Sequence, residues 1–295
     1  MACARILFPL RLGLAWLVFL TLLSSGPALA KPRIATLDWA LAETLLGIGV
    51  TPLAMASPNI YNAWVGEPRA PQGVQDIGLR NQPNLEQLAA LEPDVILMSP
   101  RFSSLEPRLS RIAPVHQLGL YNTEQDVWPT LLALTRRLGE ISDSPQSAET
   151  LIDDTRALFA TWRKRLAPYR DTPLLIVQFS DDRHLRVFGD HGLFQVALDS
   201  LGLTNAWQGD TNAYGFALID LQELATIEAR IVIVEPLPMG VEPALAHSGL
   251  WRRLIARNPH GVGTLPETWS FGALPSLQRF TRLLGRLLTK GADDA

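Results

Sequence analysis

The sequence predicts an α/β protein with two similar lobes, mainly parallel sheets, one long rigid helix joining the lobes, and a ligand cleft between them. Three observations support this prediction. Residues 85–107 and 221–243 share one pattern at a constant offset of 136 positions. Apolar strands alternate with amphipathic helices around both copies, which is typical of parallel sheets covered by helices. Residues 144–168 form one uninterrupted helical stretch between the copies.

Residues 1–30 are typical of a secretory signal peptide. Arg5 and Arg11 accompany an apolar run that a Gly-Pro pair ends, and an Ala-x-Ala cleavage site finishes at Ala30. We expect cleavage after Ala30 and export to the periplasm, with an uncleaved membrane anchor as the alternative. The single cysteine, Cys3, belongs to this segment, so a mature chain would have neither disulfides nor thiolate metal sites.

Composition narrows the class of the mature chain. Removal of thirty residues leaves 265, with 24 basic and 29 acidic side chains and a net charge of −5. No basic tract indicates a nucleic-acid partner. No second apolar span reaches the roughly 18 residues that a membrane helix requires. We therefore expect a soluble exported protein that acts as a monomer.

The two lobes are expected at residues 31–142 and 169–295. The first begins with the strand, helix and second strand of "RIATLDWALAETLLGIGVTPLAMAS", and "LLIVQFS" with "GLFQVALDSLGLTNAW" suggests the same order in the second. The connecting segment, 143–168, has a candidate cap at Ser144, Pro145 at the first helical position and Pro168 as terminator. These signals predict one helix of roughly 22 residues, about 33 Å long.

Arg80 is the first candidate ligand contact. It follows a short extended run and precedes a helix for which Asn84 is the expected N-cap. Loops at the carboxyl ends of strands line the ligand crevice of α/β proteins, so Arg80 suits an anionic or oxygen-rich ligand. A structural pair with Asp76 or Glu86 is the alternative.

Several aromatic residues are further candidates. Trp64 and Trp269 occur in stretches that read as irregular and polar, where ligand contact is favoured over packing. Trp207 and Tyr214 flank a polar loop of the second lobe that contains Asn212. Three other tryptophans are expected to be packed in the core or to lie at the surface, namely Trp128, Trp162 and Trp251.

Three segments carry a family resemblance: "RNQPNLEQLAALEPDVI", "LFQVALDSLGLTNAWQGDTNAYG" and "SFGALPSLQRFTRLL". They resemble the periplasmic ferric-hydroxamate-binding proteins of siderophore ABC importers, within the helical-backbone class of substrate-binding proteins. The resemblance covers essentially the whole mature chain. It implies capture of a ferric siderophore and its delivery to an inner-membrane ABC permease. It also implies no cofactor and no protein metal ligand, because the siderophore holds the iron. Binders of heme, cobalamin or another iron chelate are the alternative within the class.

The resemblance also assigns residues to the ligand site. The arginine that grips the chelate corresponds to Arg80, and the aromatic wall to Trp64, Trp207 and Trp269. At three further positions this chain differs from the family: Phe102 and Phe271 replace tyrosines, and Tyr214 replaces a tryptophan. The site is thus expected to keep its arginine and rings while losing hydroxyl donors.

Two additional arginines bear on the expected charge of the ligand. Arg101 and Arg186 stand where relatives carry small or apolar residues. If Arg186, in "HLRVFG", faces the cleft, a ligand with a free carboxylate is favoured, such as a citrate-hydroxamate siderophore. A solvent-facing position on an edge strand, or a pair with Asp181 or Asp182, is the alternative.

Glu106 and Glu242 occupy equivalent positions of the internal repeat. Acids near a helix start are favoured by the helix dipole, which would account for both. The family class suggests a second role, in which one carboxylate from each lobe docks the permease. An exported α/β enzyme is the competing class, but the sequence lacks the nucleophile-elbow, phosphate-loop and zinc-protease motifs, and we expect no catalytic activity.

Overall fold

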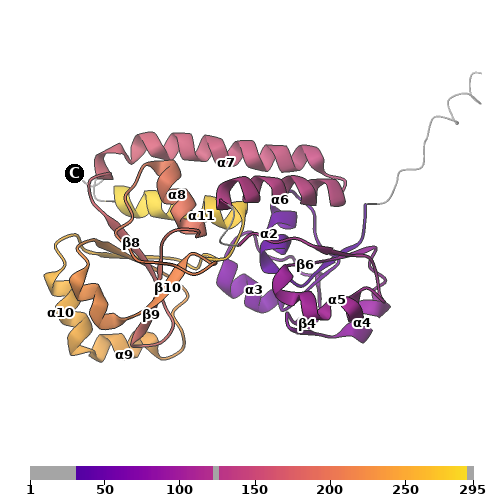
Figure 1. Cartoon of the computed structure of the whole chain (residues 1–295), viewed down its shortest axis with the longest axis horizontal. Helices are drawn as coiled ribbons and strands as arrows, with labels where there is room; N and C mark the ends of the chain where they lie inside the picture. Colours follow the sequence, from indigo (N-terminus) through magenta and orange to yellow (C-terminus); the bar gives the residue numbers. More distant parts are fainter. Residues whose placement is uncertain (1–30, 122–125, 291–295) are drawn as a thin grey trace, which may run out of the picture. The chain divides into compact units, whose positions relative to one another are not determined.

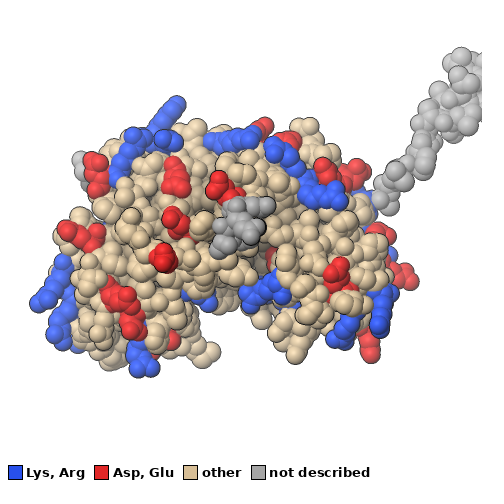
Figure 2. Space-filling view, viewed as in Figure 1, with Lys and Arg blue, Asp and Glu red and all other residues tan. Residues whose placement is uncertain are grey.

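The computed structural model describes residues 31–121 and 126–290, so the predicted signal segment 1–30 lies outside the described residues. Pro32 and the described residues after it belong to one compact unit. In this unit two five-stranded sheets with their helices lie on either side of a hollow in the surface (Figures 1 and 2). The arrangement confirms the predicted α/β fold with two lobes.

The first lobe contains a sheet in which every pairing is parallel, in the order β3-β2-β1-β6-β7. The strands are β1 (Ile34–Thr36), β2 (Ala54–Met55), β3 (Gln75–Asp76), β6 (Val95–Met98) and β7 (Val115–Gln117). The connecting elements are α2 (Trp39–Gly47), α3 (Pro58–Val65), a hairpin of β4 (Gly78–Leu79) and β5 (Gln82–Pro83), α4 (Leu85–Ala90), the 3-10 helix η1 (Pro100–Leu105) and α5 (Glu106–Leu109). β1 and β6 are buried along their whole length because helices cover both faces of the sheet.

The second lobe contains a mixed sheet in the order β10-β9-β8-β11-β12. Its strands are β8 (Leu174–Phe179), β9 (His184–Phe188), β10 (Phe216–Asp220), β11 (Arg230–Val234) and β12 (Val262–Leu265). β9 is antiparallel to both β8 and β10. The predicted strand-helix-strand order is therefore wrong here, because the short turn at 180–183 lets β9 fold back beside β8. The strand expected after α8 (Leu193–Leu201) is reduced to one parallel bridge between Leu174 and Asn205.

The internal repeat produces matching elements in the two lobes. β6 and β11 occupy the same place in their sheets, each beside the first strand of its lobe. The following helices, α5 and α9 (Val241–His247), begin within one residue of equivalent positions. The repeats differ in two helices: α4 is an α-helix whereas η3 (Leu221–Thr226) is a 3-10 helix, and η1 has no counterpart between β11 and α9.

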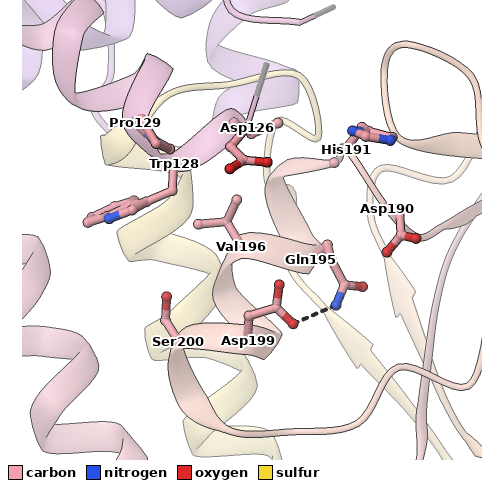
Figure 3. A pocket seen from close by; sticks show the side chains of 11 residues that line it. Asp126, Trp128, Pro129, Asp190, His191, Gln195, Val196, Asp199 and Ser200 are labelled. Atoms are coloured by element: carbon pink, nitrogen blue, oxygen red, sulfur yellow. Dashed lines mark hydrogen bonds between the residues drawn. The ribbon is translucent and has the colours of Figure 1, made fainter. Parts of the chain in front are cut away.

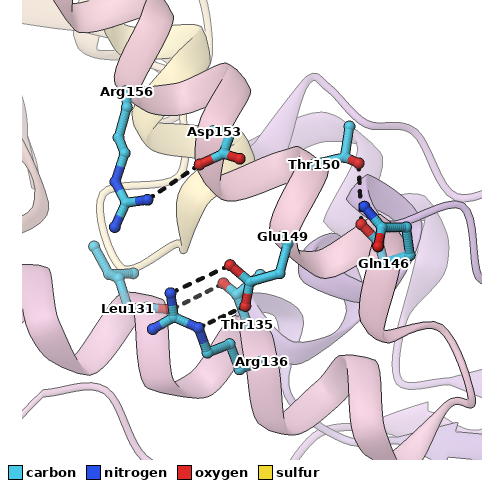
Figure 4. Close-up of polar contacts among 8 residues, drawn as sticks. All are labelled: Leu131, Thr135, Arg136, Gln146, Glu149, Thr150, Asp153 and Arg156. Atoms are coloured by element: carbon cyan, nitrogen blue, oxygen red, sulfur yellow. Dashed lines mark hydrogen bonds and ion pairs between the residues drawn. The ribbon is translucent and has the colours of Figure 1, made fainter.

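The connecting segment forms helix α7 (Pro145–Arg165), with Ser144 at its N-cap as predicted. Helix α6 (Val127–Ile141) runs beside it, and Arg136 Nε donates to Glu149 Oε1 at 2.6 Å across the pair (Figure 4). A Cβ atom at Gly139 would lie 2.6 Å from the Cβ atom of Ala148. Glycine at this position therefore allows the close approach of α6 to α7.

One apolar core lies under α7 and joins the two lobes. It includes Leu41 of α2, Phe159 of α7, Phe194 of α8 and Phe280 of α11 (Leu274–Thr289). The rings of Phe194 and Phe280 stack with centroids 4.2 Å apart. Because protein interiors are densely packed, this shared core fixes α7 and α11 to both lobes. The two remaining helices are η2 (Ala167–Tyr169) and α10 (Gly249–Arg257). No helix within the described ranges is both long and apolar enough to cross a membrane.

Candidate functional site

Aromatic side chains from both lobes meet in a group that we call the ring cluster. Its members are Trp39, Trp64, Tyr121, Tyr214, Phe216, Trp269 and Phe271. Trp269 and Phe271 form its centre, with ring centroids 5.3 Å apart. Trp269 contacts Trp39 of α2 at 5.1 Å, and Phe271 contacts Phe216 of β10 at 5.7 Å. Trp39 and Trp269 are buried, whereas Trp64, Tyr214, Phe216 and Phe271 are half-buried. The half-buried rings offer apolar faces and few fixed hydrogen bonds to a ligand.

Two half-buried arginines border the ring cluster, one beside each of its two central rings. The Cζ atom of Arg80 lies 4.0 Å from the ring centroid of Trp39 and 5.6 Å from that of Trp269. The Cζ atom of Arg186 lies 5.3 Å from the centroid of Phe216 and 5.6 Å from that of Phe271. Guanidinium groups over ring faces gain a cation–π attraction and keep their N–H donors available.

The electrostatic environment leaves both guanidinium groups short of negative charge. Burial lowers the pKa of Arg80, the carboxylate of Asp38 opposes that change, and the positive charge of Arg101 adds to it. Burial also lowers the pKa of Arg186. In the described part of the chain, neither arginine belongs to an ion pair with a carboxylate. The arrangement therefore favours an anionic or oxygen-rich ligand.

The hairpin of β4 and β5 determines the position of Arg80. Gly78 has a φ of +83°, which glycine adopts without strain, and its N–H donates to Asp76 Oδ1 at 2.9 Å. The same carboxylate accepts from Ser57 N at 3.1 Å. Asp76 therefore stabilises the turn, and the predicted alternative of an Arg80–Asp76 pair is not what the structure shows.

Arg186 lies on β9, an interior strand between β8 and β10. The expected alternative of an edge strand is therefore wrong. The alternative of a pair with Asp181 or Asp182 is also wrong, because Arg186 forms an ion pair with neither. Asp181 instead accepts hydrogen bonds from the backbone of Arg183 and His184. The side chain of Arg186 reaches Gln178 of β8, with Nη1 to Oε1 at 3.5 Å.

The segment that carries Trp269 and Phe271 is held by two groups from the first lobe. Glu43 of α2 is fully buried and accepts hydrogen bonds from Ala273 N and from Ser276 Oγ at the start of α11. The hydroxyl of Tyr121 donates to the carbonyl of Gly272 at 2.5 Å. Burial raises the pKa of Glu43 to about 8, with smaller opposing effects from its hydrogen bonds. The two central rings are thus fixed before any ligand binds.

Two predicted aromatic contacts differ in their setting from what the sequence indicated. Trp64 does not lie in an irregular stretch but in helix α3, where Tyr61 and Val65, one turn apart, form the buried face. Trp64 itself is half-buried against Trp269, with centroids 6.0 Å apart. Phe102 is 5 % exposed and packs in the apolar core of the first lobe, because without a hydroxyl nothing opposes its full burial.

The remaining predicted contacts lie around the ring cluster or beside it. Tyr214 belongs to the cluster, whereas the ring of Trp207 packs over Gly189 and Gly209, where a Cβ atom would come within 2.7 Å of it. Asn212 is exposed, and its Oδ1 accepts from Tyr214 N at 2.9 Å, which shapes the loop. Arg101 is exposed and lies near enough to Arg80 to affect its pKa.

Three members of the ring cluster were not expected from the sequence, namely Trp39, Tyr121 and Phe216. Trp39 is the first residue of the helix that follows β1, so a large ring at the carboxyl end of a strand was the available signal. Tyr121 and Phe216 carry no comparable signal, since each meets the cluster through long-range packing. Of the three tryptophans assigned to packing or the surface, Trp162 and Trp251 are buried, and Trp128 of α6 packs against Phe159.

A cavity of about 630 Å³ lies elsewhere, between the start of α6 and the start of α8 (Figure 3). Its lining includes the carboxylates of Asp126, Asp190 and Asp199, and the last of these accepts from Gln195 Nε2 at 2.7 Å. None of the predicted ligand contacts lines it. Three carboxylates disfavour a ligand that presents oxygen atoms, so the ring cluster with its arginines is the better candidate site. No group of three His, Cys, Asp or Glu side chains in the described ranges is arranged to hold a metal ion.

The two predicted docking residues lie outside the ring cluster, at matching places in the lobes. Glu106 is the first residue of α5, and Gln117 Nε2 donates to its carboxylate. Glu242 is an exposed residue in the first turn of α9. Both are at helix starts, as the sequence indicated.

Two α/β lobes with a shared core, a connecting helix and a candidate ligand site between them are the features of two-lobe substrate-binding proteins. The chain belongs to the periplasmic binding protein family, whose model matches residues 34–255. It is 31% identical over 258 residues to the iron(3+)-hydroxamate-binding protein FhuD of Escherichia coli (strain K12), covering 87% of each chain.

Further relatives support the same family. The crystal structure of the siderophore-binding protein FhuD from Vibrio cholerae, bound to Fe3+-Desferal, has a TM-score of 0.82 and 27% identity, covering 88% of this chain and 98% of that one. The achromobactin-binding periplasmic protein of Dickeya dadantii (strain 3937) is 35% identical over 124 residues, which are 38% of this chain and 39% of that protein.

Proposed function

We propose that this protein is a periplasmic substrate-binding protein that captures a ferric siderophore of the hydroxamate type and delivers it to an inner-membrane ABC permease. The observation that supports the proposal most directly is the half-buried guanidinium of Arg80, stacked on Trp39 within the ring cluster and without a carboxylate partner among the described residues. Family membership and the named ligands of the two FhuD relatives support the same class of ligand.

The chemistry of the site suits an iron atom that arrives already chelated. A ferric siderophore presents oxygen atoms with partial negative charge, surrounded by organic linkers of variable shape. The planar fork of an arginine can donate to two such oxygens at once. Ring faces cover the linkers without requiring fixed hydrogen bonds, so tolerance of several related chelates is expected.

The purified mature protein is expected to bind ferric hydroxamate siderophores with quenching of its tryptophan fluorescence. A coloured chelate at the ring cluster would lie against the half-buried Trp64 and close to the buried Trp39 and Trp269, which contact each other and Trp64. A titration panel of ferric trihydroxamates, ferric citrate-hydroxamates, heme and cobalamin tests this, with the iron-free siderophores as controls. Saturation by heme or cobalamin without any response to a ferric hydroxamate would overturn the assignment.

Arg80→Ala is expected to weaken binding of the ferric hydroxamate by about 1.5 to 3 kcal/mol, the usual contribution of a hydrogen bond to a charged group. The fold should remain, because the turn is stabilised by Asp76 and Gly78 rather than by the arginine. Arg108→Ala, which removes an exposed arginine from α5, is the matched control. Normal affinity in Arg80→Ala would limit Arg80 to packing against Trp39.

A further inference from the structure

Arg186 occupies a position that is unfavourable for a cation in the ligand-free protein. Its strand lies inside the sheet, and its neighbours in register are Gln178 on β8 and Leu218 on β10. The Oε1 atom of Gln178, at 3.5 Å from Nη1, is the hydrogen-bond acceptor that its side chain reaches. A half-buried charge without a counter-ion costs free energy, which an apolar residue at the same position would avoid.

The contacts with Phe216 and Phe271 offset only part of this cost. A cation–π contact contributes only a modest stabilisation, and among the aromatic side chains phenylalanine is not the strongest partner. Two carboxylates of the same sheet region already have other partners. Asp181 stabilises the turn before β9, and both Asp181 and Asp220 contact the ring of His184. Among the described residues, therefore, no carboxylate pairs with Arg186, and a bound ligand can supply the negative charge.

The position of Arg186 relative to Arg80 indicates which molecule supplies that charge. Arg80 borders Trp269, Trp269 contacts Phe271, and Phe271 borders Arg186. The two guanidinium groups therefore border the same pair of rings, Arg80 beside Trp269 and Arg186 beside Phe271, so one ligand at this cluster can meet both. Arg80 is enough for the hydroxamate oxygens of a neutral chelate, which leaves Arg186 for a second, more strongly charged group.

We infer that the preferred ligand carries a free carboxylate besides its iron-binding groups, and that Arg186, with Gln178, binds this carboxylate. The inference rests on the proposed function and narrows it to ferric citrate-hydroxamate siderophores. A ferric trihydroxamate is electrically neutral at the metal centre, whereas a citrate-hydroxamate chelate retains carboxylates that do not neutralise the iron. Arginine suits this role because its fork matches the two oxygens of a carboxylate.

The test compares two probes on the full mature protein, ferrichrome as the neutral trihydroxamate and ferric aerobactin as the citrate-hydroxamate. Fluorescence titration should give a dissociation constant for ferric aerobactin at least about tenfold lower than for ferrichrome. Added salt should weaken the binding of ferric aerobactin more than that of ferrichrome, because an ion pair is screened. The salt series uses only the wild-type protein, so its result does not depend on whether a substitution disturbs folding.

Variants locate the effect. Arg186→Gln should weaken binding of ferric aerobactin by about tenfold or more and change that of ferrichrome by less than about threefold. Arg186→Lys should retain part of the preference, since the charge remains without the fork. Arg183→Gln, at an exposed arginine just before β9, is the matched control and should leave the ratio unchanged.

The outcomes separate the two proposals. Tighter binding of ferrichrome by the wild type, or an equal loss for both probes in Arg186→Gln, overturns the inference while the proposed function stands. If neither probe binds the wild-type protein, the proposed function fails and the inference fails with it.

Discussion

Reversing the charge of both Glu106 and Glu242 to arginine is expected to abolish uptake of the ferric siderophore by cells while leaving its affinity for the purified protein unchanged. The two residues lie in the first turns of α5 and α9, at equivalent positions of the internal repeat. A permease with two related halves would meet both carboxylates at once with basic side chains. Two reversed charges would replace two attractions by two repulsions, and like charges in contact exclude a partner.

Uptake of radiolabelled iron by cells that carry the variant as their sole copy measures this effect, alongside fluorescence titration of the purified variant. The matched control is Glu92→Arg with Glu228→Arg. These two exposed residues are also related by the offset of 136, but they precede β6 and β11 instead of following them. Normal uptake in the Glu106 and Glu242 double variant would leave both residues as acids that merely favour a helix start.

Replacing Glu43 by glutamine is expected to change how stability depends on pH. Burial raises the pKa of Glu43 to about 8 from an ordinary value of 4.5. Between these two values the folded protein holds a proton that the unfolded chain has released, so the free energy of unfolding of the wild type falls as pH rises. The slope from this one group is at most about 1.4 kcal/mol per pH unit, and no further loss is expected above about pH 8.

Glu43→Gln keeps an amide that can accept from Ala273 N but does not ionise, so this part of the slope should vanish and the variant should be the more stable protein near pH 8. Urea unfolding of both proteins across pH 4.5 to 8 measures the difference. Glu43→Ala should be destabilised at every pH, since it leaves buried donors of α11 without their acceptor. Thr44→Val, a buried change in the same helix, is the control and should keep the wild-type slope. An unchanged slope in Glu43→Gln would show that Glu43 does not titrate in this range.

The internal repeat allowed much of the fold to be predicted from the sequence. The equivalence of β6 with β11, and of α5 with α9, depends on local apolar patterns that recur along the chain. The hairpin of β8 and β9 was not predicted, because a short turn and a strand-helix connection can follow the same apolar run. The sequence therefore indicated the strand of Arg186 but did not show that this strand lies between two others in the sheet.

The candidate site was predicted where residue type or the family resemblance carries the signal, and missed where long-range packing decides. Arg80, Trp269, Phe271 and Tyr214 meet as expected. Phe102 shows the limit, since a single aromatic residue after a strand gives no indication of which side of the loop it faces, and the structure buries it. Trp39 meets Trp269 across most of the chain, and no local pattern reveals such a contact.

The capping of α11 by Glu43 has a consequence for the order of folding. The hydrogen bond between Glu43 and Ala273 joins residues that are 230 positions apart, and both groups are buried. Closing a loop of that length is entropically unfavourable and slow compared with forming a helix or a hairpin. The first lobe cannot bury Glu43 favourably until the last helix has docked, so its final packing must wait for nearly the whole chain. Refolding should then show early formation of secondary structure and a late, single step in which the ring cluster and its tryptophan fluorescence reach their native state.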